Sequence, residues 1–107
     1  MSEHVIVFMT AGSSEEAQKI SRGLVENKLA YCVNTVPSIQ STYFWEGKVC
    51  TDEELLLIAK TRADAFDNLK AWVLDAHSYD VPEIVAIPIA AGLESYLKCV
   101  DDWTGKG

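Results

Sequence analysis

His77 is the residue whose type and neighbours are best suited to metal chemistry. It lies close in sequence to Tyr79 and Glu83, and imidazole is a common ligand for copper and zinc. The structural alternative is a protonated histidine at a helix end, which interacts favourably with the helix dipole. One chain supplies too few donors around His77 for a closed tetrahedral site. We therefore expect either donors from a neighbouring subunit or a weak site that keeps water ligands, with copper bound most tightly.

A second group of residues suggests a ligand cleft between subunits. Lys60 ends an apolar run, and a cation there could meet an anionic or aromatic ligand. The residues that we predict for this cleft are Cys32, Tyr43, Trp45, Lys60, Tyr79 and Glu83. The alternative is that the aromatic side chains pack in an interface, which we favour for Trp45, and that Lys60 pairs with Glu83. For Cys32 the alternative is a small apolar residue of a strand.

The three cysteines, Cys32, Cys50 and Cys99, are widely spaced and form no C-x-x-C pair. The sequence therefore predicts neither a disulfide framework nor a zinc ribbon, and a reducing cytoplasm is the simplest compartment. The first residues do not resemble a signal peptide, and no apolar stretch approaches the roughly 20 residues that span a bilayer. We expect His4, near the terminus, to be solvated.

Composition excludes several kinds of partner. The 107 residues include nine basic and sixteen acidic ones, which gives a net charge of −7. This balance argues against nucleic acid, because a phosphate backbone needs a basic face, and against an anionic membrane surface. Hydrophobic residues make up 49% of the chain and no linker or repeat is visible. We therefore expect one domain over residues 1–107.

The motifs of common enzymes are missing. The sequence contains no G-x-S-x-G, no Gly-rich phosphate loop and no H-E-x-x-H, so we predict that the protein is not an enzyme. Cys32 and His77 could form a nucleophile and base only if the fold brought them together. The acidic run at residues 52–54 lacks the spaced oxygen donors of a calcium loop, and we expect a solvated turn there.

Hydrophobic periodicity predicts the first strand and the first helix of the fold that positions these residues. Val5–Met9 is a continuous apolar run, typical of a strand that is covered on both faces. Ser13 and Glu16 have the spacing of a capping box. Apolar residues then recur at helical spacing, which predicts a helix over about 14–28.

The middle and the end of the chain contain the patterns of the remaining strands and helices. Residues 30–46 and 48–61 favour two strands joined by a two-residue turn at Glu46-Gly47. Asp64 is suited to cap a second helix with Phe66, Leu69 and Val73 on its apolar face. A strand over 84–89, with Pro88 marking an edge or an end, and a short terminal helix follow. This order predicts an α+β, ferredoxin-like βαββαβ fold with a C-terminal helix.

The central hairpin is too long for a domain of this size. An unbroken strand from Ala30 to Glu46 would reach about 55 Å at roughly 3.3 Å per residue, whereas a domain of this length has a radius of gyration of about 13 Å. Even with a break at Pro37, the aromatic arm must project beyond the sheet. Exposed strand edges either aggregate or pair with another chain. We therefore expect an oligomer closed by rotational symmetry.

Four segments of the sequence resemble the CutA family of divalent-cation tolerance proteins. They are residues 24–26 with 29–34, residues 41–48 with the pattern S-x-Y-x-W-x-G-K, residues 58–61, and residues 77–84 with the pattern H-x-Y-x-V-P-E-I. The resemblance covers nearly the whole chain. It implies a ferredoxin-like fold, a cytoplasmic homotrimer whose long hairpins pair across subunits, and an association with copper and other divalent metals. The trimer is similar to that of PII signalling proteins, which implies an alternative role in binding a small molecule or a partner protein between subunits.

The sequence departs from the family pattern at three positions. Some relatives have Cys where this chain has Met9 and a second His where it has Ala76, and Ser78 stands where the family usually has Pro. The first two changes remove ligands proposed for copper. The resemblance therefore leaves His77 and the thioether of Met9 as the expected metal ligands.

Overall fold

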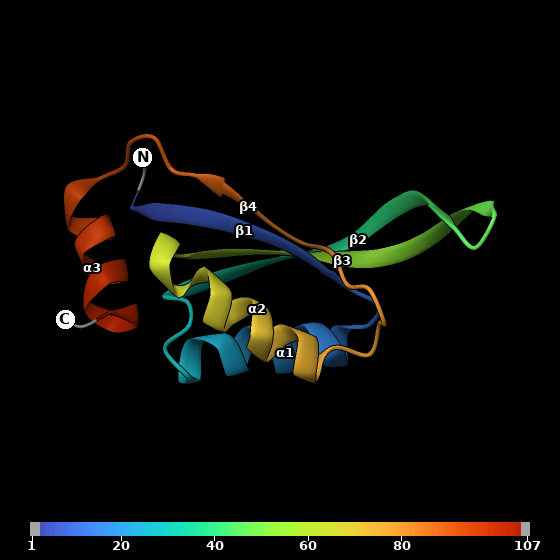
Figure 1. The fold of residues 1–107 in the computed structure, drawn as a ribbon, viewed down its shortest axis with the longest axis horizontal. Coiled ribbons are helices and arrows are strands. Elements are labelled where there is room, and N and C mark those ends of the chain that lie inside the picture. The colour runs from blue at the N-terminus through green and yellow to red at the C-terminus, as the bar shows by residue number, and fades with distance from the viewer. Residues whose placement is uncertain (1–2, 106–107) are drawn as a thin grey trace.

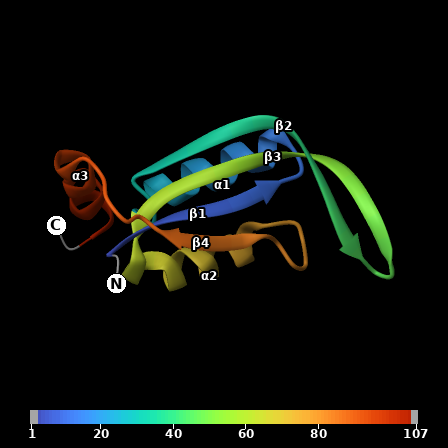
Figure 2. The same cartoon turned by 90° about the horizontal axis from the view of Figure 1, so that it is seen from above.

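The computed structural model describes residues 3–105 and contains one antiparallel sheet with three helices. The strands, in the sheet order β2-β3-β1-β4, are β1 (His4–Ala11), β2 (Cys32–Trp45), β3 (Lys48–Arg62) and β4 (Ile84–Pro88). The helices are α1 (Ser14–Glu26), α2 (Phe66–Ala76) and α3 (Glu94–Thr104). Helices α1 and α2 lie on one face of the sheet, and α3 lies at its end (Figures 1 and 2). The predicted α+β, ferredoxin-like order with a C-terminal helix is confirmed.

The hydrophobic core lies between the sheet and the helices α1 and α2. Alternate residues of a strand point to the same face, so every second residue of β1 and β3 meets the helices. The core residues are Val7, Met9, Ala11, Leu57 and Ala59 from the strands, with Ala17, Ile20, Leu24, Ala30, Leu69 and Val73. The predicted apolar face of the second helix is confirmed by the burial of Leu69 and Val73.

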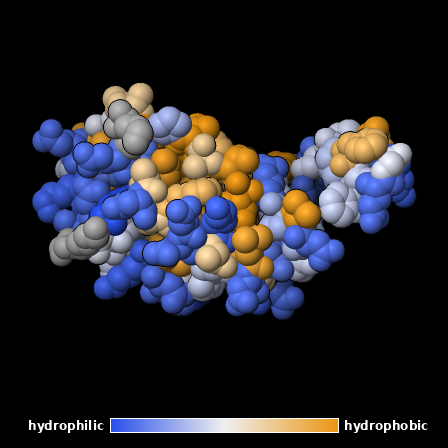
Figure 3. Space-filling model, viewed as in Figure 1, coloured by the Kyte–Doolittle hydropathy of each residue, from blue (hydrophilic) through white to orange (hydrophobic). Residues whose placement is uncertain are grey.

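The opposite face of the sheet is largely apolar over its middle, and among residues 3–105 the only helix that reaches it is α3, at the end where Asp101 contacts His4. Strand register places six hydrophobic residues on it, which are Ile6, Phe8, Leu56, Ile58, Val85 and Ile87. Val85 is 51% exposed and Ile87 is 47% exposed. Figure 3 shows apolar side chains gathered over the middle of the body and again at the tip of the hairpin. The fold therefore leaves exposed an apolar sheet face of a kind that is covered in most proteins.

The β2–β3 hairpin projects beyond the rest of the sheet, as predicted. Strand β1 pairs only with residues 55–62 of β3, so residues 48–54 pair with β2 alone. The molecule measures 44 × 25 × 22 Å, and the projecting arm accounts for its elongated shape (Figures 1 and 2). A bulge between Val36 and Ile39 interrupts the ladder at the expected break. The turn has φ angles of 49° at Glu46 and 84° at Gly47, which fits the predicted two-residue turn.

Two local predictions about helix starts need correction. Asp64 does not cap α2; it lies in a 3₁₀ turn over Ala63–Ala65, and its carboxylate pairs with Arg62 at 2.6 Å. The capping box at Ser13 is half formed, because the Ser13 hydroxyl accepts from the Glu16 N–H at 3.1 Å. The Glu16 carboxylate instead accepts from the Ser78 N–H at 2.8 Å. At Glu16 a tertiary partner, the Ser78 N–H, replaces the local cap, and at Asp64 the nearby Arg62 side chain takes the carboxylate.

His4 and the acidic run also differ from expectation. His4 is not solvated: its side chain is 14% exposed and its Nε2 lies 2.8 Å from Asp101 Oδ1 of α3. The residues Asp52, Glu53 and Glu54 belong to β3 and form no turn. Glu54 is only 6% exposed. Over residues 3–105, the longest apolar stretch in any helix falls short of what crossing a bilayer requires.

Candidate functional site

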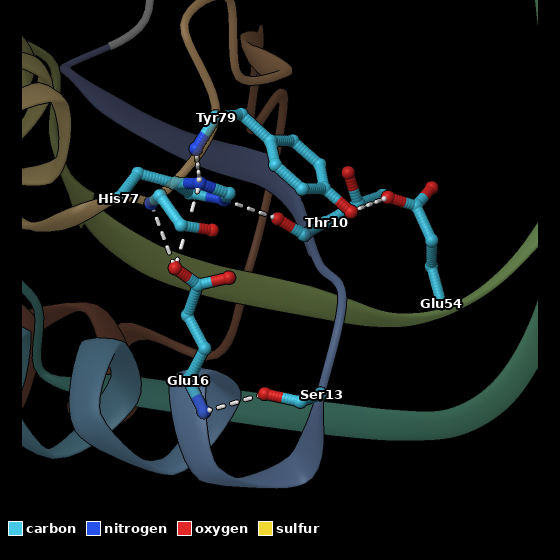
Figure 4. A network of polar contacts seen from close by, with 7 residues as sticks. Thr10, Ser13, Glu16, Glu54, His77 and Tyr79 are labelled. Carbon is cyan, nitrogen blue, oxygen red and sulfur yellow. Dashed lines mark hydrogen bonds and ion pairs between the residues drawn. The ribbon is translucent and has the colours of Figure 1, made fainter.

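His77 lies at the end of α2, and its imidazole is fully buried. Its Nε2 is 2.8 Å from the carbonyl oxygen of Thr10 in β1. Its Nδ1 is 3.1 Å from the backbone nitrogen of Tyr79 and 3.8 Å from Oε2 of Glu16. Figure 4 shows the ring held between these partners from three separate segments of the chain.

The partners of His77 define its tautomer. A carbonyl oxygen can only accept, so Nε2 carries the proton and donates to Thr10. The Tyr79 N–H donates, so Nδ1 accepts and carries no proton. The geometry therefore describes a neutral imidazole with both nitrogens engaged. In this conformation His77 has no lone pair free for a metal ion.

Met9 directly precedes Thr10, whose carbonyl oxygen contacts His77, in β1. It is fully buried in the hydrophobic core and pairs in register with Leu57 and Ile84. Within residues 3–105, no cluster of three or more His, Cys, Asp or Glu side chains is suited to hold a metal ion. The donors of one chain therefore do not fit a closed divalent-metal site, which needs about four ligands.

Tyr79 links the His77 segment to the arm. Its hydroxyl donates to Oε2 of Glu54 at 2.8 Å, and its ring lies 4.6 Å from the imidazole of His77. Burial, together with the Glu54 carboxylate, raises the pKa of Tyr79 well above its usual value. Gly12 makes room for this phenol, because a Cβ there would lie 2.9 Å from the Tyr79 oxygen. Tyr79 is thus a fixed, protonated donor to a nearly buried carboxylate.

Glu16 completes the network at the N-terminus of α1. Burial acts to raise the pKa of its carboxyl, but hydrogen bonds from Ser78 outweigh that effect and leave the pKa below its ordinary value. The carboxylate also lies beside the neutral His77 ring. This arrangement ties the loop after α2 to the start of α1, which is a structural role.

Lys60 does not form the ion pair that we considered with Glu83. Its ammonium donates to the side-chain oxygen of Asn34 on the neighbouring strand β2. Register with Ile6 and Cys32 places Lys60 on the open face of the sheet. Glu83 is exposed and precedes β4. A cation thus lies on the open face beside the apolar side chains of Ile6 and Ile58.

Tyr43 and Trp45 lie near the tip of the arm. They are 41% and 42% exposed. The hydroxyl of Tyr43 donates to Asp52 across the hairpin, and this hydrogen bond raises the pKa of Tyr43 to about 12. Phe44 and Val49 face each other on the arm and are 70% and 71% exposed.

One chain does not gather the predicted cleft residues into one place. Cys32 and Lys60 lie side by side at the root of the hairpin, and Tyr43 and Trp45 lie near its tip. Tyr79 lies between these two ends through its bond to Glu54. Since the predicted cleft is formed between subunits, it stays a prediction.

Sequence reasoning missed the partners that hold His77 and Tyr79. These are Thr10, Glu16 and Glu54, from β1, α1 and β3. The only available signal was an acidic residue interrupting strand β3 at the position where its pattern turns apolar, since a carboxylate inside a strand needs a partner. The contact with His77 uses the backbone carbonyl of Thr10. Because every residue type has this group, the sequence carries no signal of the contact.

Comparisons with known proteins agree with this fold. Residues 5–103 match the model of the CutA1 divalent ion tolerance protein. The chain is 49% identical over 100 residues to the divalent-cation tolerance protein CutA of Thermus thermophilus, covering 94% of this chain and 97% of the relative. It is 44% identical over 100 residues to the chloroplastic protein CutA of Arabidopsis thaliana. That match covers 94% of this chain and 55% of the plant protein, so this chain spans about half of that relative.

Solved structures give the same result. The divalent cation tolerance protein of Thermus thermophilus has a TM-score of 0.93 at 48% identity, covering 95% of this chain and 99% of the other. CutA1 from Oryza sativa has a TM-score of 0.94 at 42% identity, covering 99% and 97%. The sequence match and the shared fold extend over nearly the whole chain, and the chain therefore belongs to the family of CutA1 divalent ion tolerance proteins.

Proposed function

We propose that this protein acts in divalent-cation tolerance as a homotrimer that binds a divalent ion, copper(II) first, where its chains meet. Family membership supports the role, because the relatives from Thermus thermophilus and Archaeoglobus fulgidus are divalent-cation tolerance proteins by name. We assign the protein a binding role without catalysis. Its three cysteines are free, which favours a reducing compartment such as the cytoplasm.

The observation that carries the proposal is the apolar middle of the open sheet face, which none of the helices within residues 3–105 covers (Figure 1). The arm of a second chain could cover it, because the exposed side chains of Phe44 and Val49 are apolar and the arm projects beyond the sheet. Closed rotational symmetry would let each chain give one arm and receive another. Burial of these side chains would contribute roughly 25 cal/mol per Å² of apolar surface.

The location of the ion follows from the donor set. His77 has both nitrogens hydrogen-bonded within its own chain, so it could bind a metal only after releasing Thr10 or Tyr79. Met9 would have to leave the core. Donors from two chains avoid both costs, and copper(II) has the highest affinity for nitrogen and oxygen donors among divalent first-row ions.

The test combines mass and metal titration. Sedimentation velocity should give three times the chain mass, and calorimetry should detect copper(II) binding to that species. A double variant, Phe44→Glu with Val49→Glu on the arm, should yield monomers that have lost the binding. A monomeric wild type would overturn the trimer. Equal copper(II) affinity in the monomeric variant would overturn a site between chains.

Two histidine variants then decide the part played by His77. His77→Ala removes the buried imidazole, and His4→Ala is the matched control, since His4 is the other histidine of the chain. Copper(II) affinity lost in His77→Ala and kept in His4→Ala would identify His77 as a ligand. Met9→Leu should leave the copper(II) affinity unchanged, because the side chain at this position is buried in the core.

A second candidate function is PII-like binding of an anionic small molecule or an acidic protein partner in the clefts between chains. The observation that favours it is the ammonium of Lys60, which lies on the apolar open face. A ligand from a panel of anionic metabolites should raise the melting temperature, and Lys60→Met should abolish that shift. A flat response across the panel would leave copper(II) as the only supported ligand.

A further inference from the structure

The arm, residues 39–54, leaves the body of the sheet at one level of the hairpin. The last pair between β1 and β3 joins Ala11 to Leu55, so Glu54 is the first residue of β3 that β1 no longer holds. On the other strand a bulge interrupts the ladder directly before Ile39, the partner of Glu54. Figure 2 shows the hairpin changing direction where it leaves the body. Both strands are thus weakened at the same level, where a bulge lets a strand bend and where a hinge is expected.

The backbone and the space around this level also fit a hinge. Ser38, inside the bulge, has a φ of 59°, which a residue with a side chain seldom adopts and which strains the backbone. A cavity of about 220 Å³ lies beside it. Gly12 and Ser14 line this cavity from the body, and Ser38, Glu53 and Glu54 line it from the hairpin. The root of the arm therefore has room to move toward the start of α1.

One hydrogen bond ties the arm to the body at this hinge. The hydroxyl of Tyr79 donates to Oε2 of Glu54 at 2.8 Å (Figure 4), and Glu54 is almost completely buried. Among residues 3–105, no other side-chain hydrogen bond joins the arm to the rest of the chain, because the hydroxyls of Thr42 and Tyr43 bond within the arm. A hydrogen bond to a carboxylate is about twice as strong as one between neutral groups.

The body holds the phenol of Tyr79 in place. Its ring centroid lies 4.6 Å from that of His77, and its backbone N–H donates to Nδ1 of His77 at 3.1 Å. Gly12 leaves the space that the hydroxyl occupies. A Cβ there would lie 2.9 Å from the Tyr79 oxygen but 3.6 Å from the nearest ring carbon, which is an ordinary contact. The absence of a side chain at Gly12 is therefore needed for the hydroxyl and not for the ring.

We propose that the Tyr79–Glu54 hydrogen bond is a latch that fixes the angle between the arm and the body, and that its release lets the arm swing about the hinge at residues 36–39 and 53–55. The latch then sets the direction in which the apolar tip of the arm approaches another chain. Tyr79 acts as a positioning residue. The latch goes beyond the proposed function, because it lies within one chain and involves no metal ion, so its test is independent of trimer mass and of copper(II) affinity.

The experiment measures hydrogen–deuterium exchange of the purified protein by mass spectrometry, with peptides from the arm root (residues 36–40 and 51–56) and from β1. Tyr79→Phe keeps the ring contact with His77 and removes the donor. Exchange at the arm root should become about 10- to 100-fold faster, as expected for the loss of one hydrogen bond to a charged group, while exchange in β1 stays the same. Tyr43→Phe is the matched control, because the Tyr43 hydroxyl donates to Asp52 within the arm. It should leave exchange at the arm root as in the wild type.

Gly12→Ala tests the same latch by steric means. It should speed exchange at the arm root as Tyr79→Phe does. Added to Tyr79→Phe it should change little further, because the methyl group would meet the remaining ring at an ordinary contact distance. Four results would overturn the proposal: unchanged exchange at the arm root in Tyr79→Phe, an equal increase in Tyr43→Phe, an increase of the same size in β1, or fully additive effects of Gly12→Ala and Tyr79→Phe.

Discussion

The indole of Trp72 in α2 lies against Gly23 in α1, with no space left for a side chain at the glycine. A Cβ atom built on Gly23 would lie 2.2 Å from Cη2 of Trp72. The two helices therefore approach each other through a residue that is poor in helices. The glycine is kept by packing, because helix propensity alone would favour alanine.

Gly23→Ala should destabilise the protein. Alanine gains about 1 kcal/mol of helix propensity, but forcing a methyl group into this contact costs about 1–3 kcal/mol. Urea unfolding at fixed protein concentration should show a net loss of about 1 kcal/mol. In a Trp72→Leu background the same change should be stabilising. A loss of equal size in both backgrounds would show that Trp72 is not the cause.

Thr61→Val should stabilise the protein by about 1 kcal/mol, because an unsatisfied buried hydroxyl costs roughly 1–3 kcal/mol. Thr61 is fully buried in β3, and its hydroxyl has no hydrogen-bond partner among residues 3–105. Valine has the same shape without the polar atom. Thr51→Val is the control, since the exposed Thr51 hydroxyl lies 3.3 Å from that of Thr42. If Thr51→Val raised the melting temperature more than Thr61→Val did, the prediction would be contradicted.

Substitutions at the two turn residues with positive φ should change the stability of the protein in opposite directions. Glu46 has a φ of 49°, which asparagine tolerates better than glutamate, so Glu46→Asn should gain up to about 1 kcal/mol. Gly47→Ala should lose about 1 kcal/mol, since φ is 84° there. No atom lies within 4 Å of a Cβ at Gly47, so the loss would come from backbone conformation alone. Chemical denaturation measures both, and effects of the same sign would refute this account.

Glu16 should make stability depend on pH in the acid range. Its folded-state pKa lies below the ordinary value of 4.5, so the folded chain binds fewer protons there than the unfolded chain. The stabilisation is therefore fully present above pH 4.5 and is lost as the pH falls through the folded-state pKa. Glu16→Gln should flatten the stability profile below pH 4.5. Glu15→Gln, in the same helical turn, should leave the profile steep; two equally flattened curves would assign the effect to the helix dipole.

The strand order and the arm could be predicted because they depend on local patterns. Apolar periodicity placed Val5–Met9 and the first helix correctly, and the Glu46-Gly47 pair located the turn. The partners of His77 could not be predicted, because they join three segments and one of them is a backbone carbonyl. Asp64 was assigned as a cap on local grounds, but the neighbouring Arg62 side chain offered a stronger ionic partner.

The burial of Glu54 and of His4 could not be predicted from the sequence either. Both are polar residues in strands, and sequence alone assigned them to solvent. The structure buries them because a partner distant in sequence, Tyr79 or Asp101, satisfies each one. Such pairs become visible only once the sheet order brings the segments together.

The arm also shapes the order in which the chain folds. From Ile39 to Glu54 it pairs residues that are close in sequence, and hairpins of this kind form within microseconds. Pairing of β1 with β3 and β4 closes long loops and is slower. We therefore expect the arm to form first, with its aromatic side chains exposed before the rest of the sheet has formed. Asp52 and Glu53 lie on the strand edge that β1 leaves unpaired. Negative charges on such an edge disfavour pairing with strands of other chains, so we expect them to limit aggregation while the chain folds.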